Sequence, residues 1–140
     1  MRTAIDFIFI QFYNNPSCNL NSPGFLAALQ DWSDDLSLSP TNNTDNNDPS
    51  STFIDTYNGV NSPRLYVGAP AFPAAGSGWV GGEEFSSLVA QVKGLRLPNL
   101  GGVMFWDGAY GVLSKSQDGA YGRTGVGRSY MGLVKDVFAP

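Results

Sequence analysis

The sequence contains no histidine, and this absence limits the chemistry that the chain can perform. Without imidazole, the Ser-His-Asp and Cys-His arrangements of nucleophilic catalysis are excluded, and so are zinc sites with histidine ligands. The single cysteine, Cys18, has no second thiol with which to form an internal disulfide. Two interpretations of Cys18 fit equally well: a small buried thiol, or a disulfide to a cysteine of a partner elsewhere.

Positive charge and long apolar runs are scarce as well. The 140 residues include 8 Lys and Arg against 12 Asp and Glu, with a formal net charge of −4 and no basic cluster. Because phosphate binding needs concentrated positive charge, we expect no nucleic-acid partner. No apolar run is long enough to span a bilayer and Met1 is followed by no signal peptide, so we expect no membrane partner. The length fits one domain, and a hydrophobic share of 42% is enough for a core.

Three segments have the composition of buried strands. They are residues 5–12, 65–69 and 101–107, each rich in β-branched or aromatic side chains. The first is a nearly unbroken apolar run, which predicts a strand buried on both faces, as in a parallel sheet covered by helices.

Helical patterns alternate with these strands. Ser22 and Pro23 predict a helix start, with Ser22 as N-cap and Pro23 at the first helical position. The apolar positions then recur at helical spacing in three segments, listed in order as Phe25, Leu29, Trp32 and Leu36; Phe85, Leu88, Val89, Val92 and Leu95; Tyr130, Val134, Val137 and Phe138. Glu83 and Glu84 are better explained as helix-start carboxylates than as a catalytic dyad. The order β-α-β-α-β-α predicts an α/β fold with three parallel strands and right-handed crossovers.

Two segments carry neither pattern. Residues 37–63 are polar and turn-rich, and we expect a disordered surface insertion there. Asn42 begins an N-glycosylation triplet, although chance explains such a triplet better in an Asn-rich segment. Residues 108–128 form a Gly-rich loop. The sequence DGAYG occurs at 107–111 and again at 118–122, which is too short for a repeat architecture.

Polar and aromatic side chains follow the first and third strands where each one ends. Gln11, Tyr13 and Asn14 follow the first strand, and Trp106 and Asp107 end the third. Because parallel strands end on the same face, we expect these side chains to converge. An aromatic face, a hydroxyl and amides suit an uncharged ligand such as a sugar. The alternative is a core role for both rings, with the first strand simply running into an Asn-Pro turn.

Three motifs in this order resemble the sixth, seventh and eighth strands of the family 18 chitinases, in their fungal and plant class III branch. The motifs are QFYNNPSC, then LYVGAPA followed by AAGSGWV, then GGVMFWD. The resemblance runs from Ile5 to about Asp107, and the last helix resembles the closing helix of the family's barrel. The Asn-rich insertion and the extended DGAYG region depart from the family pattern.

The resemblance implies a (β/α)8 TIM barrel that hydrolyses β-1,4-linked N-acetylglucosamine by substrate-assisted retention. It implies that Tyr13 positions the acetamido group and the oxazolinium-like intermediate, and that Trp106 forms the floor under the sugar. Gln11 and Asn14 would line the same subsite. The resemblance also implies a cis peptide at Trp106-Asp107, secretion, chitin or chito-oligosaccharides as substrate, and neither a cofactor nor a metal.

The family's acidic signature, DxxDxDxE, is not found in the sequence. In the family it lies on strand four, so we interpret residues 1–140 as the C-terminal part of the catalytic domain, a fragment without the general acid Glu. The missing N-terminal barrel part would be needed for a complete fold, and Cys18 would pair, if at all, with a Cys on that part. Two alternatives remain, a non-catalytic, lectin-like chitin-binding protein and an enzyme that uses Asp107 as a substitute acid.

Overall fold

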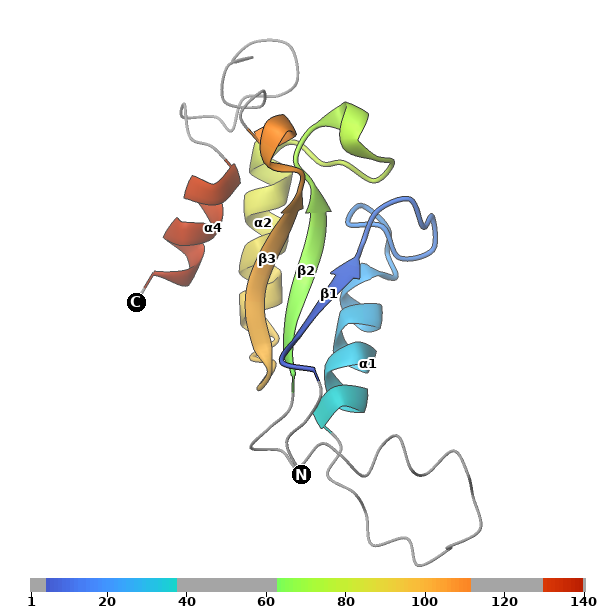
Figure 1. Cartoon of the computed structure of the whole chain (residues 1–140), viewed down its shortest axis with the longest axis vertical. Helices are drawn as coiled ribbons and strands as arrows, with labels where there is room; N and C mark the ends of the chain where they lie inside the picture. The colour runs from blue at the N-terminus through green and yellow to red at the C-terminus, as the bar shows by residue number, and fades with distance from the viewer. Residues whose placement is uncertain (1–4, 38–62, 112–129, 140) are drawn as a thin grey trace, which may run out of the picture.

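The computed structural model describes residues 5–37, 63–111 and 130–139. In chain order the elements are β1 (Phe7–Gln11), α1 (Phe25–Ser37), β2 (Arg64–Pro70), the short 3-10 helix η2 (Pro73–Ala75), α2 (Gly82–Gly94), β3 (Leu100–Trp106) and α4 (Tyr130–Phe138). Figure 1 shows the strands side by side, with α1 and α2 behind them and α4 beside α2.

The three strands form one parallel sheet in the order β1-β2-β3. Phe7 to Gln11 pair with Arg64 to Gly68. The pairing of β2 with β3 shifts by one residue between Leu65 and Tyr66 and then continues up to the pair Pro70 and Trp106. The predicted class, three parallel strands alternating with helices, is therefore confirmed. Each connection carries a helix, as parallel strands require.

The core lies between the sheet and its helices. Phe12 is fully buried and meets Phe25 of α1 edge to face, with the ring centroids 4.9 Å apart. On the other side of the core, Phe85 of α2 contacts Tyr130 of α4 at 4.9 Å. The Tyr130 hydroxyl donates a hydrogen bond of 2.7 Å to the carbonyl of Val80, which satisfies its buried polar atom. The predicted buried face of α2 is confirmed at Phe85, Val89 and Val92. In α4 the buried residues are Tyr130, as predicted, and Leu133, whereas the other predicted positions are only partly buried.

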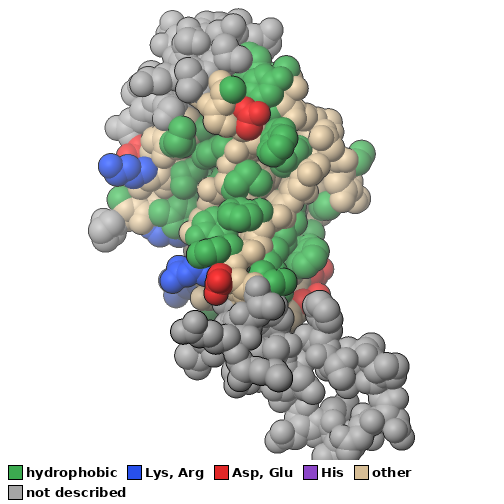
Figure 2. Space-filling model, in the orientation of Figure 1, with side chains coloured by type: hydrophobic (Ala, Val, Ile, Leu, Met, Phe, Trp, Pro, Cys, Tyr) green, Lys and Arg blue, Asp and Glu red, His purple; other side chains and the backbone are tan. Residues whose placement is uncertain are grey.

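The prediction that the first strand is buried on both faces is wrong. Phe7 and Phe9 are each 55% exposed, whereas Ile8 and Ile10 pack against the core. In the described part of the chain, helices cover only one face of the sheet, so alternate side chains of β1 remain in contact with solvent. Figure 2 looks onto that open face and shows hydrophobic side chains along the sheet.

Helix α1 also differs from the prediction at its start and on its buried face. It begins at Phe25, and the Ser22 hydroxyl donates to the carbonyl of Ser17 (3.1 Å) instead of capping the helix. Trp32 is 45% exposed, and the buried position one residue later is Ser33. Ser33 can be buried because its hydroxyl donates to Oδ1 of Asn99 at 2.7 Å.

Helix α2 carries Glu83 and Glu84 in its first turn, as predicted, and both are exposed. None of the helices described is long and apolar enough to cross a membrane. Residues 38–62 and 112–129 lie outside the described residues. The predicted insertion, the Asn42 triplet, most of the Gly-rich loop and the second DGAYG copy fall there, so these predictions remain untested.

Candidate functional site

The strand register places the predicted site residues at one edge of the sheet. Gln11 pairs with Gly68, and Pro70 pairs with Trp106. The Phe12 N–H donates to the Gly68 carbonyl (3.1 Å), which keeps the chain beside β2 for one residue beyond β1. Tyr13 and Trp106 therefore lie at the ends of the two strands that flank β2.

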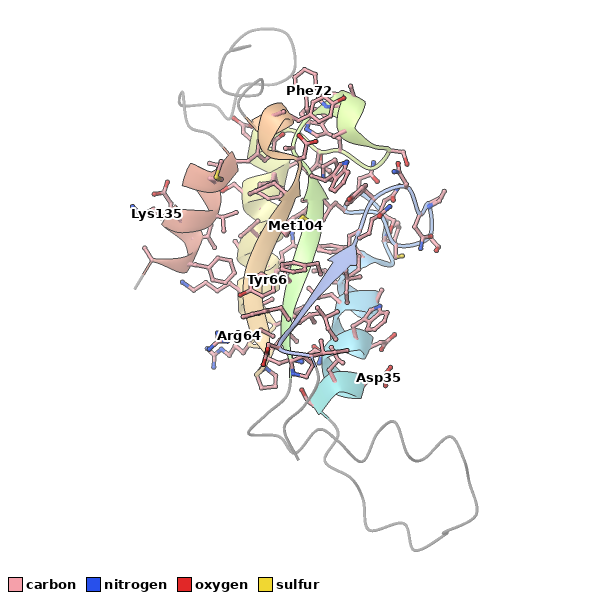
Figure 3. The ribbon with its side chains drawn as sticks, in the orientation of Figure 1. Asp35, Arg64, Tyr66, Phe72, Met104 and Lys135 are labelled. Atoms are coloured by element: carbon pink, nitrogen blue, oxygen red, sulfur yellow. The ribbon has the colours of Figure 1, made fainter. Side chains whose placement is uncertain are left out.

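Trp106 presents its ring to the open face of the sheet. Its neighbour Phe105 packs against the core, and alternation along the strand turns Trp106 to the opposite side, where it is 51% exposed. Below it on the same face lie Met104 and Tyr66, which Figure 3 labels on the sheet. The open face is therefore lined with apolar and aromatic side chains up to the edge that carries Trp106.

Hydrogen bonds hold the backbone at Trp106 and at the residue that follows it. Its carbonyl accepts a hydrogen bond from the Ala71 N–H at 2.9 Å, which joins the end of β3 to the loop after β2. The Trp106-Asp107 peptide is cis, as the resemblance implied. Asp107 then accepts from the Tyr110 N–H through Oδ1 at 3.1 Å. This carboxylate therefore stabilises the turn that follows the strand.

Tyr13 is almost fully buried, with 5% of its surface exposed. Burial raises the pKa of its hydroxyl above the ordinary value for tyrosine. The group therefore stays protonated and able to donate at neutral pH. Within the described part of the chain, that hydroxyl makes no hydrogen bond. The Tyr13 hydroxyl is also not among the fully buried polar atoms that lack a partner, so its oxygen can be reached by a ligand.

The two amide side chains predicted at the site differ in how the protein uses them. Gln11 is exposed, and its Nε2 donates to the carbonyl of Tyr13 at 3.0 Å. Asn14 is exposed as well, yet its Oδ1 accepts from both the backbone N–H (2.8 Å) and the hydroxyl (3.3 Å) of Ser77. The Asn14 oxygen is therefore engaged within the protein, and only its NH₂ group is left for a ligand.

Sequence reasoning missed several residues of this edge. Phe72 and Tyr110 stack nearly parallel, with centroids 5.8 Å apart and an interplanar angle of 10°, and so connect the loop after β2 to the turn after β3. Figure 3 places Phe72 at this end of the sheet. Gly76 and Ser77 contact the loop after β1. The AAGSGWV motif was the available signal for the last two, although its spacing does not reveal which strand loop it touches.

Charged groups are few at this edge. Across residues 5–37, 63–111 and 130–139, no group of three or more Cys, Asp or Glu residues could hold a metal ion. Cys18 is a free, half-buried thiol. The arrangement can bind a neutral, hydroxyl-bearing ring through stacking and hydrogen bonds.

The strands are parallel, helices connect them, and polar and aromatic side chains lie at the carboxyl ends of the strands. These features define part of an α/β barrel. The chain is 34% identical over 104 residues to Endochitinase 3 of Metarhizium anisopliae, a match that covers 74% of this chain and 27% of that protein. It is 31% identical over 106 residues to the Acidic endochitinase of Vitis vinifera, which covers 75% of this chain and 28% of that protein. It is 32% identical over 124 residues to Chitinase 3 of Candida albicans, which covers 86% of this chain and 18% of that protein.

The chain is therefore a relative of the fungal and plant chitinases, and the resemblance predicted from its motifs is confirmed. It spans about a quarter of the length of the first curated relatives it matches. No protein-family model matches the chain.

Proposed function

We propose that this chain is part of a chitinase and that the carboxyl edge of its sheet binds β-1,4-linked N-acetylglucosamine. The observation that carries the proposal is the strand register, which brings Tyr13 and Trp106 to the same edge. The relatives named endochitinase support the substrate class.

Each site residue has a role that follows from its contacts. Trp106 offers an exposed ring on which the apolar face of a sugar can stack. The Tyr13 hydroxyl donates to the acetamido oxygen, which needs a donor that stays protonated. Gln11 lines the same subsite from β1, and Asn14 lies beside Tyr13 with its Oδ1 held by the Ser77 N–H.

In the complete enzyme the chemistry is substrate-assisted retention. The acetamido oxygen attacks the anomeric carbon while a Glu donates its proton to the leaving glycosidic oxygen, and an oxazolinium ion forms. Water then gives a proton to the Glu carboxylate and attacks the anomeric carbon, the carbon–oxygen bond of the oxazolinium ring breaks, and both the acetamide and the Glu acid are restored. The hydrogen bond from Tyr13 holds the acetamido group in position for the attack.

In this proposal the general acid comes from outside this chain. The only glutamates of the sequence are Glu83 and Glu84, and both are exposed in the first turn of α2. Asp107 stabilises the turn after β3 through Tyr110, which gives it a structural role in place of an acid role. We therefore assign residues 1–140 to part of a family 18 catalytic domain, secreted as the resemblance implies. A barrel part outside this sequence would supply the acid.

A second candidate function is reversible chitin binding without catalysis. The exposed Trp106 ring favours it, as does the Tyr13 hydroxyl, which has no hydrogen-bond partner among the described residues, because binding needs these groups and no acid. The two functions predict different activities when the remainder of a barrel is supplied: a chitinase segment then supports hydrolysis, whereas a binding protein does not.

We expect the purified chain to release no fluorophore from a fluorogenic chito-oligosaccharide, because the Glu that protonates the leaving oxygen is missing. Turnover by the chain alone, abolished by Tyr13→Phe, would contradict this assignment.

The control that separates the two functions is a chimera in which residues 5–139 replace the matching segment of the Metarhizium anisopliae Endochitinase 3. A chitinase segment gives a chimera that hydrolyses the same substrate. A soluble, folded chimera that binds chitin but does not turn it over would favour the binding protein.

A further inference from the structure

We propose that Asn14 and the turn Gly76–Ser77–Gly78, here called the GSG turn, form a positioning device for Tyr13. Asn14 is then a positioning residue and does not itself bind the sugar. This inference rests on the proposed function, since it explains how the Tyr13 hydroxyl is held for the acetamido group.

Asn14 and Ser77 bind each other through three hydrogen bonds. The Asn14 N–H donates to the Ser77 carbonyl at 3.0 Å, and the Ser77 N–H donates to Oδ1 of Asn14 at 2.8 Å. The Ser77 hydroxyl adds a third bond to the same Oδ1 at 3.3 Å. The loop after β1 is thereby attached to the loop after β2, next to the backbone of Tyr13.

The ring of Tyr13 lies against Gly76. A Cβ at position 76 would lie 2.9 Å from Cδ2 of Tyr13 and 3.0 Å from Oδ1 of Asn14, closer than carbon atoms normally approach. The absence of a side chain at Gly76 therefore lets the GSG turn lie directly on the ring of Tyr13, a residue that is only 5% exposed.

The other end of the GSG turn is equally constrained. Gly78 has a φ of +86°, and a Cβ there would lie 2.5 Å from Cγ of Asn19. Asn19 is buried and accepts from the Asn15 N–H at 2.8 Å, while the Leu20 N–H returns to the Phe12 carbonyl at 3.0 Å. The segment on both sides of Tyr13 is thus folded back on itself and covered by the turn.

Asn14 has the backbone conformation that this arrangement needs. Its φ of 56° lies in the left-handed region, which Asn and Asp adopt more readily than other residues that carry a side chain. Asp also retains an oxygen acceptor at the position of Oδ1, whereas Gly keeps the backbone conformation and loses the acceptor. These two substitutions separate a positioning role from direct contact with the sugar.

The experiment measures the affinity of the full chain for the N-acetylglucosamine tetramer by calorimetry. We expect Asn14→Gly to weaken binding about tenfold, and Asn14→Asp to stay within about threefold of the wild type, because Asp can still accept from Ser77. If the Asn14 NH₂ group bound the sugar, Asp would lose that donor. Equal losses in the two variants, with both folded, would overturn the proposal.

A second measurement does not depend on sugar binding. In NMR spectra of the free chain, we expect contacts between the Tyr13 ring protons and the Gly76 Hα protons in the wild type and in Asn14→Asp, and their loss in Asn14→Gly. Contacts that persist unchanged in Asn14→Gly would overturn the positioning role. If the wild type shows the contacts but binds no tetramer, the proposed function fails while the positioning of Tyr13 stands.

The matched glycine control is Gly76→Ala against Gly81→Ala. A Cβ at Gly81 would meet nothing within 4 Å, and its φ of −68° suits any residue, so this variant should bind like the wild type. Gly76→Ala should displace the Tyr13 ring signals and weaken binding about as much as Asn14→Gly. Wild-type ring signals and affinity in Gly76→Ala would contradict the packing on which the proposal depends.

Discussion

Replacing Trp106 by Ala should weaken binding of the N-acetylglucosamine tetramer about thirtyfold, corresponding to roughly 2 kcal/mol for the lost stacking surface. The reason is the position of the ring, which is 51% exposed on the open face at the edge that also carries Tyr13. Because the ring contributes little to the core, the variant should remain folded. Calorimetric titration of the purified variant measures the effect.

The control for this variant is Trp32→Ala. Trp32 is 45% exposed, close to the value for Trp106, but it lies on α1 and not on the sheet. We expect its loss to leave the affinity unchanged. Similar losses in both variants would mean that exposed tryptophans bind the oligosaccharide without specificity, and would contradict a site at the sheet edge.

The largest effect on stability is expected for Phe12→Ala, which should lower the free energy of unfolding by about 3–5 kcal/mol. Phe12 is completely buried and contacts Phe25 edge to face, so its removal leaves a cavity between the sheet and α1. Urea denaturation followed by circular dichroism measures the change. A loss of this size is a large fraction of the stability of an ordinary domain, so we expect part of the variant to be unfolded in buffer without urea.

Phe9→Ala is the matched control, because Phe9 lies on β1, which ends one residue before Phe12, and 55% of its surface is exposed. Its ring contacts only the neighbouring aromatic Tyr66, at 5.0 Å, among the described aromatic pairs. We expect a loss below about 1 kcal/mol. A loss as large as that of Phe12→Ala would show that the open face of the sheet is covered in solution.

The fold class could be predicted from the sequence because each element carries a local signal. The β-branched and aromatic runs at Leu65–Ala69 and after Gly101 are typical of parallel strands, and the helical spacing from Phe85 to Val92 marks a buried face. The alternation of these elements also predicts parallel strands with right-handed crossovers, but it does not specify the register, which shifts between Leu65 and Tyr66.

The errors have a common cause, since local pattern does not reveal what covers a face. The apolar run of β1 was interpreted as buried on both sides, yet Phe7 is exposed because the described helices cover one face only. Trp32 was predicted on the buried face of α1, but the structure buries Ser33 there instead. The Ser33 hydroxyl can be buried because Asn99, which is distant in the sequence, accepts its hydrogen bond. Such a partner 66 positions away in the sequence leaves no local signal.

The candidate site was predictable only in part for the same reason. Strand ends identify Gln11, Tyr13 and Trp106, because parallel strands end on the same face. The pairing of Asn14 with Ser77, and the contact of Gly76 with the Tyr13 ring, depend on the path of two loops. All of α1 and β2 lies between these loops, and Asn14 and Ser77 are 63 positions apart. Spacing in the sequence does not specify that path.

The most direct test of the account compares two ligands in one variant. Calorimetry gives the affinities of the wild type and of Tyr13→Phe for the N-acetylglucosamine tetramer and for the glucose tetramer of the same linkage. We expect the wild type to prefer the acetamido sugar by about tenfold, and Tyr13→Phe to lose this preference while it keeps the affinity for glucose, because only the hydrogen bond to the acetamido group is removed. An unchanged preference in Tyr13→Phe would contradict the claim that Tyr13 and Trp106 bind one amino-sugar ring.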